Sequence, residues 1–362
     1  MRLLIVNVGS SSLKLSVLDG LTLVTAKTLS TPEETLDERA IEQAISGHGP
    51  FDAVGHRIVH GGAEFTEAVV VDDRVRRQLQ ALVDLAPLHL PKSLAGLDLF
   101  TKLLPQVPAA ACFDTAFHAS IPEAASTYAI PAEWRRRWPL RRFGFHGLSH
   151  AYASHRAAEL VSRPVESLRI VTCHLGSGAS LAAVRHGVSV DTTMGFTPLE
   201  GLVMATRSGT VDPGLVLWLE QHVGMPSAEL ASTLERRSGL AGLAGTGDMR
   251  AVLEAEAGGD EQASLAVAVY LHRLRAAIAA MGAAMEGLDV LVFTGGVGER
   301  APTIRSRAAR GLGFIGIGID ESADEAATPD AEVSAAGAAV GTWVIEARED
   351  LQMARELERL FA

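Results

Sequence analysis

The sequence predicts an α/β protein built from two related halves, and three observations support this. Apolar runs of strand length alternate with stretches of helical periodicity along most of the 362 residues. An element of strand, Gly-Ser turn and strand occupies residues 4–17 and recurs at 171–184. A third glycine-rich turn, Thr294–Glu299, follows the apolar run Val290–Phe293. Such turns can aim backbone N–H groups at a phosphate chain, so we expect two domains that clamp a nucleotide.

The elements of the first half follow from apolar periodicity and turn residues. The expected strands are 4–8, 13–17, 53–60 and 109–113. The 53–60 strand places Arg57 and Val59 on one face, and 109–113 delivers Asp114 at its carboxyl end, where open α/β sheets bind ligands. Residues 19–50 are weakly patterned and suggest a short strand and a polar helix. Asp72 and Asp73 are expected to cap a helix that Pro87 ends, and another helix runs to about residue 104.

The second half repeats the alternation. The segment 143–150 is expected to lead into a helix that runs to about Val161. The second hairpin is expected at 171–184, a loop at 195–209 and a mostly helical, Ala-rich stretch at 227–287. A last strand is expected at 342–345. Glu349 and Asp350 are expected to cap a closing helix through Leu360.

Composition indicates a globular protein that buries a sizeable core, with 48% hydrophobic and 21% charged residues. The net charge of −11 argues against a nucleic-acid partner. No apolar run approaches the roughly 20 residues that span a bilayer, so no membrane association is expected. Cys112 and Cys173 lie in strand-like runs, which favours buried thiols and a reducing, cytoplasmic setting. The basic cluster 135–142 suggests a solvated or interface surface, or one that steers anionic substrates.

Two arginines in Gly-rich, apolar surroundings are candidates for binding an oxyanion. An arginine fork matches carboxylate or phosphoryl oxygens, although one such arginine is commonly a structural ion pair. Arg57 and Arg207, together with Asp114 and His146, favour phosphoryl transfer, which depends on positioning and on positive charge around the transferred group.

No His/Cys spacing fits zinc, whereas Mg²⁺ needs only one or two protein oxygens beside phosphate and water. Asn7 and Glu349 fit that demand, with helix capping as the alternative for Glu349. The histidines His60, His150 and His155 are expected to be structural. No P-loop motif is present, so the 4–17 hairpin is either a phosphate-facing turn or an ordinary Ser-rich one.

Ten motifs in order resemble the acetate kinases, which belong to the actin, Hsp70 and sugar kinase superfamily. They are Asn7–Lys14, His56–Gly62, Pro87–His89, Phe113–His118, Gly144–Gly147, His174–Ser180, Phe196–Gly201, Thr206–Gly209, Thr294–Glu299 and Glu349–Leu351. The resemblance implies two ribonuclease-H-like (actin-like ATPase) domains with the active site in the cleft between them. It places the first domain at 1–116, completed by the helix 349–362, and the second at 117–348. The second domain would bind nucleotide and form a homodimer.

The resemblance also implies residue roles. Arg57 and Arg207 would hold the substrate carboxylate and the transferred phosphoryl group, His146 would bind phosphoryl oxygens, and His89 is a further active-site histidine. Asp114 would orient an arginine or a metal-bound water; a carboxylate substrate has no proton to lose, so no general base is needed. Asn7 and Glu349 match the Mg²⁺ (or Mn²⁺) positions.

Further positions match the substrate and nucleotide contacts of the family. The apolar walls for the substrate methyl are Val59, Leu88, Phe145 and Pro198. The phosphate-facing positions are Ser10, Ser12, Lys14, His174, Gly176, Ser177 and Gly178. The base and ribose contacts are Asp248, Met249, Arg250, Gly295, Gly296, Val297, Gly298 and Glu299. The sequence departs from the family at three positions where asparagine is usual, which are Ser177, Leu90 and Arg300. The 19–50 region is also shorter than is typical. The changes at Ser177 and Arg300 leave the nucleotide affinity and the preferred phosphoryl donor open.

The expected function is therefore an acetate kinase that exchanges ATP and acetate for ADP and acetyl phosphate by direct in-line transfer. One alternative is a kinase for propionate or butyrate. Another is a non-catalytic actin-like or Hsp70-like module that binds a protein and does not need Arg57, Arg207 and His146 together. The least specific alternative is a two-domain nucleotide binder of unknown use.

Overall fold

The computed structural model describes residues 1–9, 12–31, 36–87 and 90–362, which form two compact units. The first unit contains Met1–Ala119, Phe145–Tyr152 and Arg348–Ala362, and the second contains Ser120–Gly144 and Ala153–Ala347. The boundaries expected from the sequence assign 145–152 to the second domain. The structure places this segment in the first unit because the Gly147 N–H donates to the Asp114 carbonyl at 2.8 Å and Leu148 packs in that unit's core.

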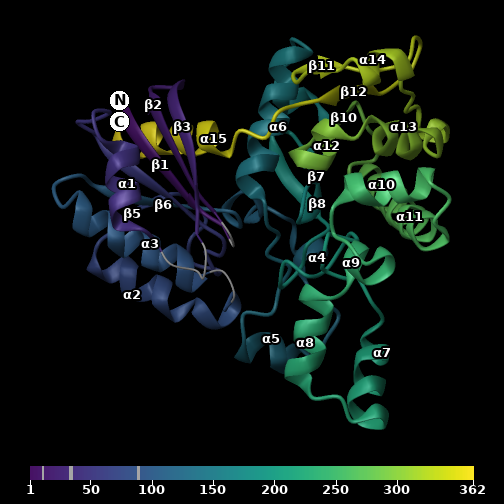
Figure 1. Cartoon of the computed structure of the whole chain (residues 1–362), viewed down its shortest axis with the longest axis horizontal. Coiled ribbons are helices and arrows are strands. Elements are labelled where there is room, and N and C mark those ends of the chain that lie inside the picture. The colour runs from purple at the N-terminus through teal and green to yellow at the C-terminus, as the bar shows by residue number, and fades with distance from the viewer. Residues whose placement is uncertain (10–11, 32–35, 88–89) are drawn as a thin grey trace. The chain divides into compact units, whose positions relative to one another are not determined.

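The described residues of the first unit form a six-stranded mixed sheet in the order β3-β2-β1-β4-β6-β5 (Figure 1). Its strands are β1 (Arg2–Val8), β2 (Ser12–Asp19), β3 (Thr22–Ser30), β4 (Ala53–Ile58), β5 (Val69–Val70) and β6 (Ala109–Phe113). The central strands β1, β4 and β6 are parallel, and β2, β3 and β5 add antiparallel edges. The carboxyl ends of the three parallel strands therefore lie at one edge of the sheet.

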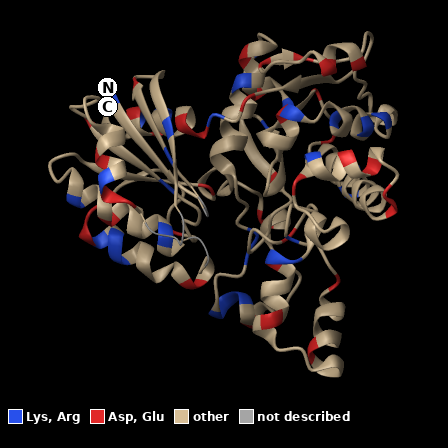
Figure 2. Ribbon diagram, in the orientation of Figure 1, with Lys and Arg blue, Asp and Glu red and all other residues tan. Residues whose placement is uncertain are grey.

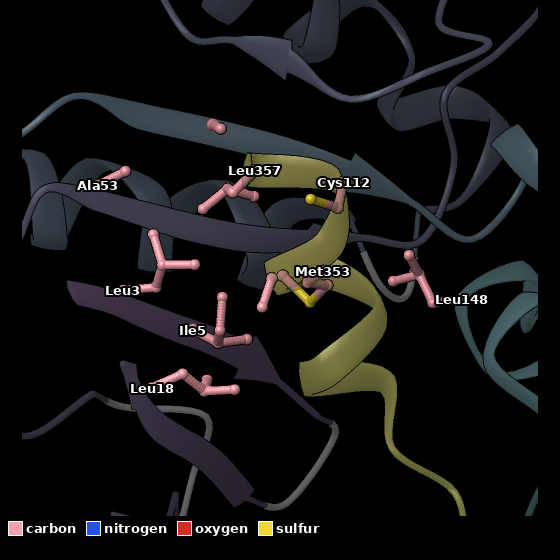
Figure 3. Close-up of a cluster of buried hydrophobic side chains, with 10 residues drawn as sticks. Leu3, Ile5, Leu18, Ala53, Cys112, Leu148, Met353 and Leu357 are labelled. Carbon is pink, nitrogen blue, oxygen red and sulfur yellow. The ribbon is translucent and has the colours of Figure 1, made fainter. Parts of the chain in front are cut away.

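Helices cover both faces of this sheet, as the alternation along β1 requires. The helical elements are α1 (Glu38–Ile45), α2 (Asp73–Ala81), η2 (Val83–Leu85), α3 (Leu90–Leu103), η3 (Ala116–His118), the first turns of α6 (Gly147–Leu160) and α15 (Glu349–Phe361). Leu3 and Ile5 of β1 pack against Met353 and Leu357 of α15 (Figure 3). Leu4 and Val6 face the opposite way, toward the side chains of α1 and α3. Both faces are thus buried.

The second unit repeats this topology with the same strand directions. Its sheet has the order β11-β12-β10-β7-β8-β9. The strands are β7 (Arg169–Leu175), β8 (Ala179–Arg185), β9 (Val188–Thr192), β10 (Val290–Thr294), β11 (Ala331–Glu332) and β12 (Gly341–Val344). The parallel core β7, β10 and β12 corresponds to β1, β4 and β6, and the remaining strands are antiparallel as in the first unit. The expected pair of ribonuclease-H-like domains is confirmed.

The helical elements of the second unit are α4 (Glu123–Ser126), α5 (Ala132–Arg137), the remainder of α6, η4 (Val165–Ser167), α7 (Pro213–Trp218), η5 (Leu219–Val223), α8 (Ser227–Arg236), α9 (Gly239–Ala244), α10 (Met249–Ala257), α11 (Glu261–Ala284), α12 (Gly295–Arg300), α13 (Pro302–Arg310), η6 (Gly313–Ile315) and α14 (Glu321–Glu325). Contrary to the sequence expectation, α11 is long and apolar enough, by length and composition, to cross a membrane. Its Val267, Leu271, Leu274 and Ile278 are buried at helical spacing, so α11 supplies core to this unit.

The helix ends and the two thiols agree with the sequence predictions except at the closing helix. The Asp72 carboxylate caps α2 by accepting from the Val75 N–H at 2.7 Å, as predicted. The prediction for the closing helix was wrong: its N-cap is Arg348, and Glu349 and Asp350 lie in the first turn. Cys112 and Cys173 are free, buried thiols, as expected.

The basic cluster is divided between surface and interior. Figure 2 shows the arginines of α5 as a blue segment, and Trp134 and Trp138 beside them are exposed. Arg142 behaves differently, because its guanidinium pairs with Glu200 at 2.7 Å and donates to three backbone carbonyls between residues 192 and 194. Arg142 therefore has a structural role, because it links Glu200 to the backbone of residues 192–194.

Candidate active site

The first unit gathers three of the predicted residues around the guanidinium of a fourth, Arg57. Arg57 donates from Nε to Asp114 Oδ1 at 2.8 Å and from Nη2 to Asp114 Oδ2 at 2.7 Å. Its Nη1 donates to Glu349 Oε2 at 3.0 Å and lies 3.4 Å from Asn7 Oδ1. Asn7 Nδ2 in turn donates to Glu349 Oε2 at 3.1 Å. This is a bidentate arginine–carboxylate pair extended by a second carboxylate and an amide.

Sheet geometry explains why residues so distant in sequence meet. Asn7 and Arg57 are the penultimate residues of the parallel strands β1 and β4, and Asp114 directly follows β6. The Asp114 N–H donates to the Ile58 carbonyl at 3.0 Å, which continues the β4–β6 pairing by one residue. Glu349 comes from the first turn of α15, which packs across the same sheet face. The expectation that Asp114 emerges at the ligand-binding edge agrees with this arrangement.

The charges of this cluster are strongly coupled. Burial opposes the charged form of Arg57, yet the negative charges of Asp114 and Glu349 outweigh it and raise the pKa of the guanidinium above its ordinary value. Arg57 therefore stays protonated at any working pH. The Asp114 side chain is only 2% exposed, whereas those of Arg57 and Glu349 are 18% and 16% exposed, so the solvent-facing flank of the cluster is the Arg57–Glu349 side.

The donors present fit a magnesium ion. Asn7 and Glu349 supply an amide and a carboxylate oxygen on one side of Arg57, joined by their own hydrogen bond. Mg²⁺ takes one or two such ligands and completes its shell with water and phosphate. Among the described residues, no group of three or more His, Cys, Asp or Glu side chains could hold a metal by itself.

His146 is held in an uncommon backbone conformation beside this cluster. Its φ of 56° lies in the left-handed region, which is uncommon for a histidine. The next residue fixes it: a Cβ on Gly147 would lie 2.2 Å from the Asp114 carbonyl, so only glycine permits the hydrogen bond between them. Such conformations persist where the surroundings over-determine them, often at functional sites. The half-buried His146 side chain is therefore placed relative to Asp114 by backbone contacts.

The second unit positions Arg207 very differently from Arg57. Its Nη1 donates to the Pro198 carbonyl at 3.0 Å and lies 3.7 Å from Met204 Sδ. Within the part of the chain that the structure describes, Arg207 forms no ion pair with a carboxylate. Burial lowers the pKa of its guanidinium, with Glu235 acting weakly in the opposite direction. Arg207 is a desolvated cation that an incoming anion would stabilise.

Tight backbone contacts fix the Arg207 loop. Gly239 has φ of 61°, and a Cβ there would lie 2.2 Å from the Met204 carbonyl and 2.6 Å from that of Arg207. The Ala205 N–H donates to the Ser177 carbonyl at 3.1 Å. The predicted Ser177 turn between β7 and β8 is therefore tied directly to the Arg207 loop.

The predicted phosphate-facing residues of the second unit gather at the carboxyl edge of β7 and β10. His174 on β7 pairs in register with Thr294 at the end of β10. Gly176 lies close to both His174 and the Gly296 N–H: a Cβ on it would be 3.8 Å from His174 Nε2 and 3.9 Å from Gly296 N. Val297 and Gly298 continue the short helix α12 that this turn opens.

Glu299 braces this turn. Its Oε1 accepts from the Gly295 N–H at 3.0 Å and from the Ala347 N–H at 2.9 Å. The carboxylate thus joins the ends of β10 and β12. Gly178 stands in the β7–β8 turn, where its carbonyl accepts from the Gly176 N–H at 2.9 Å.

The remaining predicted residues are dispersed. Asp248 caps α10, preceding Met249, and pairs with the exposed Arg250 at 2.8 Å. Val59 and Pro198 are half-buried, whereas Phe145 is buried with its ring edge-on to His60. Ser12 opens β2, and Lys14 on the same strand is exposed. Ser10, Leu88 and His89 lie outside the described residues.

Sequence reasoning missed three features of the site. It did not foresee that Glu349 pairs with Arg57, which is 292 positions away. Nor did it assign a role to Gly147, although the glycine ending the Gly144–Gly147 motif was a signal. His118, whose Nε2 lies 3.0 Å from the Phe145 carbonyl, also supports the segment that carries His146.

Comparison with known proteins identifies the family of this chain. The profile of the Acetokinase family matches residues 26–355. An acetate kinase of Microcystis aeruginosa is 48% identical over 315 residues, covering 87% of this chain and 78% of that protein. The crystal structure of Porphyromonas gingivalis acetate kinase matches with a TM-score of 0.89 at 34% identity, covering both chains completely. A propionate kinase of Francisella tularensis matches with a TM-score of 0.90 at 32% identity, covering 98% of each chain. The chain belongs to the Acetokinase family.

Proposed function

We propose that this protein is an acetate kinase that transfers the γ-phosphoryl group of ATP reversibly to acetate, giving acetyl phosphate and ADP. The observation that carries the proposal is the Arg57–Asp114–Glu349–Asn7 cluster in a chain of this family. The named relatives include acetate kinases at up to 48% identity.

The arrangement supports direct in-line transfer. A carboxylate oxygen of acetate attacks the γ-phosphorus, the bond to the β-phosphate oxygen breaks, and ADP leaves with that electron pair. No proton has to be removed from the attacking group, which agrees with a site whose buried carboxylate orients an arginine. Asp114 holds two of the three nitrogens of Arg57 and thereby directs Nη1 outward. Arg207, which lacks a carboxylate partner among the described residues, is proposed as a second cation for the transferred phosphoryl group.

We propose Mg²⁺ as the required ion, with Asn7 and Glu349 as its protein ligands. When bound, it would neutralise charge on the phosphate oxygens. Glu349 would then divide its negative charge between the ion and Arg57, so metal loading is expected to weaken the Glu349–Arg57 pair.

The acid preference depends on apolar walls that discriminate weakly. One methylene in a hydrophobic pocket is worth about 1–3 kcal/mol, so propionate is expected to be a poorer but real substrate. The likeness to a propionate kinase makes a preference for the longer acid the second candidate. Neither Val59 nor Leu88 is a small residue that would enlarge the pocket.

Acyl-hydroxamate formation tests the proposal. Purified protein would be incubated with ATP, Mg²⁺, hydroxylamine and acetate, propionate or butyrate in parallel, with a chelator control. We expect turnover with acetate greater than with propionate, and loss of turnover with the chelator. Stronger turnover with propionate would select the second candidate, and no turnover with any acid would reject the kinase.

We also propose a homodimer formed through the second unit and a cytoplasmic location. Leu215, Leu217, Trp218 and Val223 of α7 and η5 are each about half exposed or more, a concentration of apolar side chains suited to a partner surface. The two free thiols suit a reducing compartment. Sedimentation equilibrium of wild type and Trp218→Glu tests the dimer: the variant should dissociate at concentrations where wild type is dimeric, and a wild-type monomer would reject it.

A further inference from the structure

Behind the Arg57 cluster lies a second carboxyl, Glu356, that the proposed reaction does not use. It stands two helical turns after Glu349 on α15. On the sheet beneath, Cys112 is the register partner of Arg57, and Asp114 lies two residues further along, so all three emerge on one face. Figure 3 shows Cys112 beside Met353 and Leu357, which flank Glu356 on its helix.

The Glu356 carboxyl is poorly provided with hydrogen-bond donors. Its Oε1 accepts from Gln352 Nε2 at 3.1 Å. Its Oε2 is buried and accepts no N–H or O–H hydrogen bond among the described residues, although the Cys112 thiol faces the carboxyl as a weak donor. Gln352 Oε1 is likewise buried without a hydrogen-bond partner in that part of the chain. An ionised carboxylate in this position would leave one oxygen desolvated with only a weak thiol donor to compensate, which is costly. A proton on Glu356 removes the charge and supplies a donor next to the unpaired Gln352 oxygen.

The surrounding groups also favour the neutral acid. β6 presents the Cys112 thiol, the residue that follows β6 presents the Asp114 carboxylate, and β1 presents the apolar Leu3 and Ile5. Burial is the main cause and raises the pKa of Glu356, whereas hydrogen bonds from Gln352 and Cys112 and the charge of Arg359 oppose it. The charge of Asp114 adds a smaller effect that also raises this pKa. Arg359, the cation of the same helix that acts on Glu356, is exposed, and Arg355 lies over the Tyr152 ring.

Two further ionisable groups complete this environment. Glu67, which precedes β5, lines a cavity of about 250 Å³ together with Glu356 and Arg359. Arg57 from β4 is already held by two carboxylates, Asp114 and Glu349. Among the described residues, the cation that acts on Glu356 is therefore the exposed Arg359.

We propose that Glu356 is a positioning residue that carries a proton while the enzyme works, and that its ionisation weakens the binding of anionic substrates at Arg57. The proposal rests on the kinase function proposed above. A third negative charge near Arg57 makes the local potential more negative, and it repels Asp114, which orients the guanidinium. The effect reaches the substrate through Asp114 and Arg57, without contact between Glu356 and the reacting atoms.

Glu356→Gln separates this role from packing, because it keeps the shape, stays neutral at every pH and offers an N–H to Gln352 Oε1. The matched control is Glu358→Gln on the same helix, whose carboxyl lies near Gly20 rather than the Arg57 cluster. The KM for acetate and kcat would be measured across the neutral and alkaline range. In wild type and in Glu358→Gln, we expect the KM to rise about threefold or more on the alkaline side, as half a pKa unit of coupling produces.

In Glu356→Gln the alkaline rise in KM should be absent while kcat at neutral pH is retained. The same rise in wild type and Glu356→Gln, or no rise in wild type, would overturn the proposal. A wild type that does not turn over would instead refute the kinase function.

Infrared spectroscopy detects the proton on Glu356 independently of enzyme activity. At neutral pH we expect wild type and Glu358→Gln to show a protonated-carboxyl band that Glu356→Gln lacks. The absence of that band in wild type would overturn the proposal even in an active enzyme.

Discussion

Replacing Asp114 with Asn isolates the contribution of the buried pair to stability. The substitution keeps the side-chain shape but leaves an amide that can accept only one of the two Arg57 hydrogen bonds, now 2.8 and 2.7 Å long. A hydrogen bond to a charged group contributes about 1.5–3 kcal/mol, and breaking a fully buried ion pair costs about 3–5 kcal/mol. Glu349 still pairs with Arg57 at 3.0 Å, so the cation keeps one counter-charge. We therefore expect a loss of about 2–3 kcal/mol in the free energy of unfolding.

The chain contains its own control. Arg76 and Asp98 form a pair with the same bidentate geometry, at 2.7 and 2.8 Å, but the Asp98 side chain is 54% exposed against 2% for Asp114. Asp98→Asn should lose only about 0.2–1 kcal/mol, the usual contribution of a surface pair. The comparison therefore varies burial while it holds geometry constant.

Urea denaturation followed by far-UV circular dichroism provides the measurement. All four tryptophans, at 134, 138, 218 and 343, belong to the second unit, so fluorescence follows that unit, whereas circular dichroism reports both. Equal losses for Asp114→Asn and Asp98→Asn, with unchanged m-values, would refute the argument that burial makes the Arg57 pair strong.

Three further outcomes follow from the packing and the buried charges. Gly147→Ala places a Cβ 2.2 Å from a carbonyl and should destabilise by about 1–3 kcal/mol in thermal melts, whereas Gly313→Ala, with nothing within 4 Å, should be neutral. Arg305→Met leaves Asp324 buried without its partner and should cost about 3–5 kcal/mol in urea unfolding. Adding Asp324→Leu should recover most of that loss; a further loss would contradict the reasoning. Burial lowers the pKa of His56 to about 4 from 6.5, so the folded protein binds fewer protons than the unfolded chain between these values and loses stability as the pH falls through them. His56→Leu should remove up to about 1.4 kcal/mol per pH unit of that loss, and an unchanged pH slope would count against it.

Much of the site could be predicted because its residues are marked by local signals. Asn7, Arg57 and Asp114 each stand at the end of an apolar strand run, and parallel strands bring such ends to one edge. The ion pair between Arg57 and Glu349 was harder to predict from the sequence, because the two residues lie 292 positions apart. In its local sequence, Glu349 could equally be interpreted as a helix cap.

Other errors have the same origin. Arg142 belongs to a basic run that predicts exposed side chains. Its guanidinium is instead partly buried, because it pairs with Glu200, 58 positions away. The helix α11 has one buried apolar face, and Ala residues make up much of the rest. The high hydropathy of α11 therefore comes from its composition and does not show whether the helix lies in a membrane or in a protein core. Segment 145–152 belongs to the first unit through the contact of Gly147 with Asp114 and the packing of Leu148, which no periodicity predicts.

The central claim is that Arg57 and Arg207 provide the positive charge for phosphoryl transfer. The most direct test is ATP formation from acetyl phosphate and ADP by wild type, Arg57→Ala, Arg207→Ala and the exposed surface control Arg237→Ala, each checked for folding by circular dichroism. We predict that both site variants lose about 10²–10³-fold in kcat, as removal of a transition-state donor does, and that the control keeps wild-type turnover. Folded Arg57→Ala and Arg207→Ala variants with wild-type turnover would contradict the account.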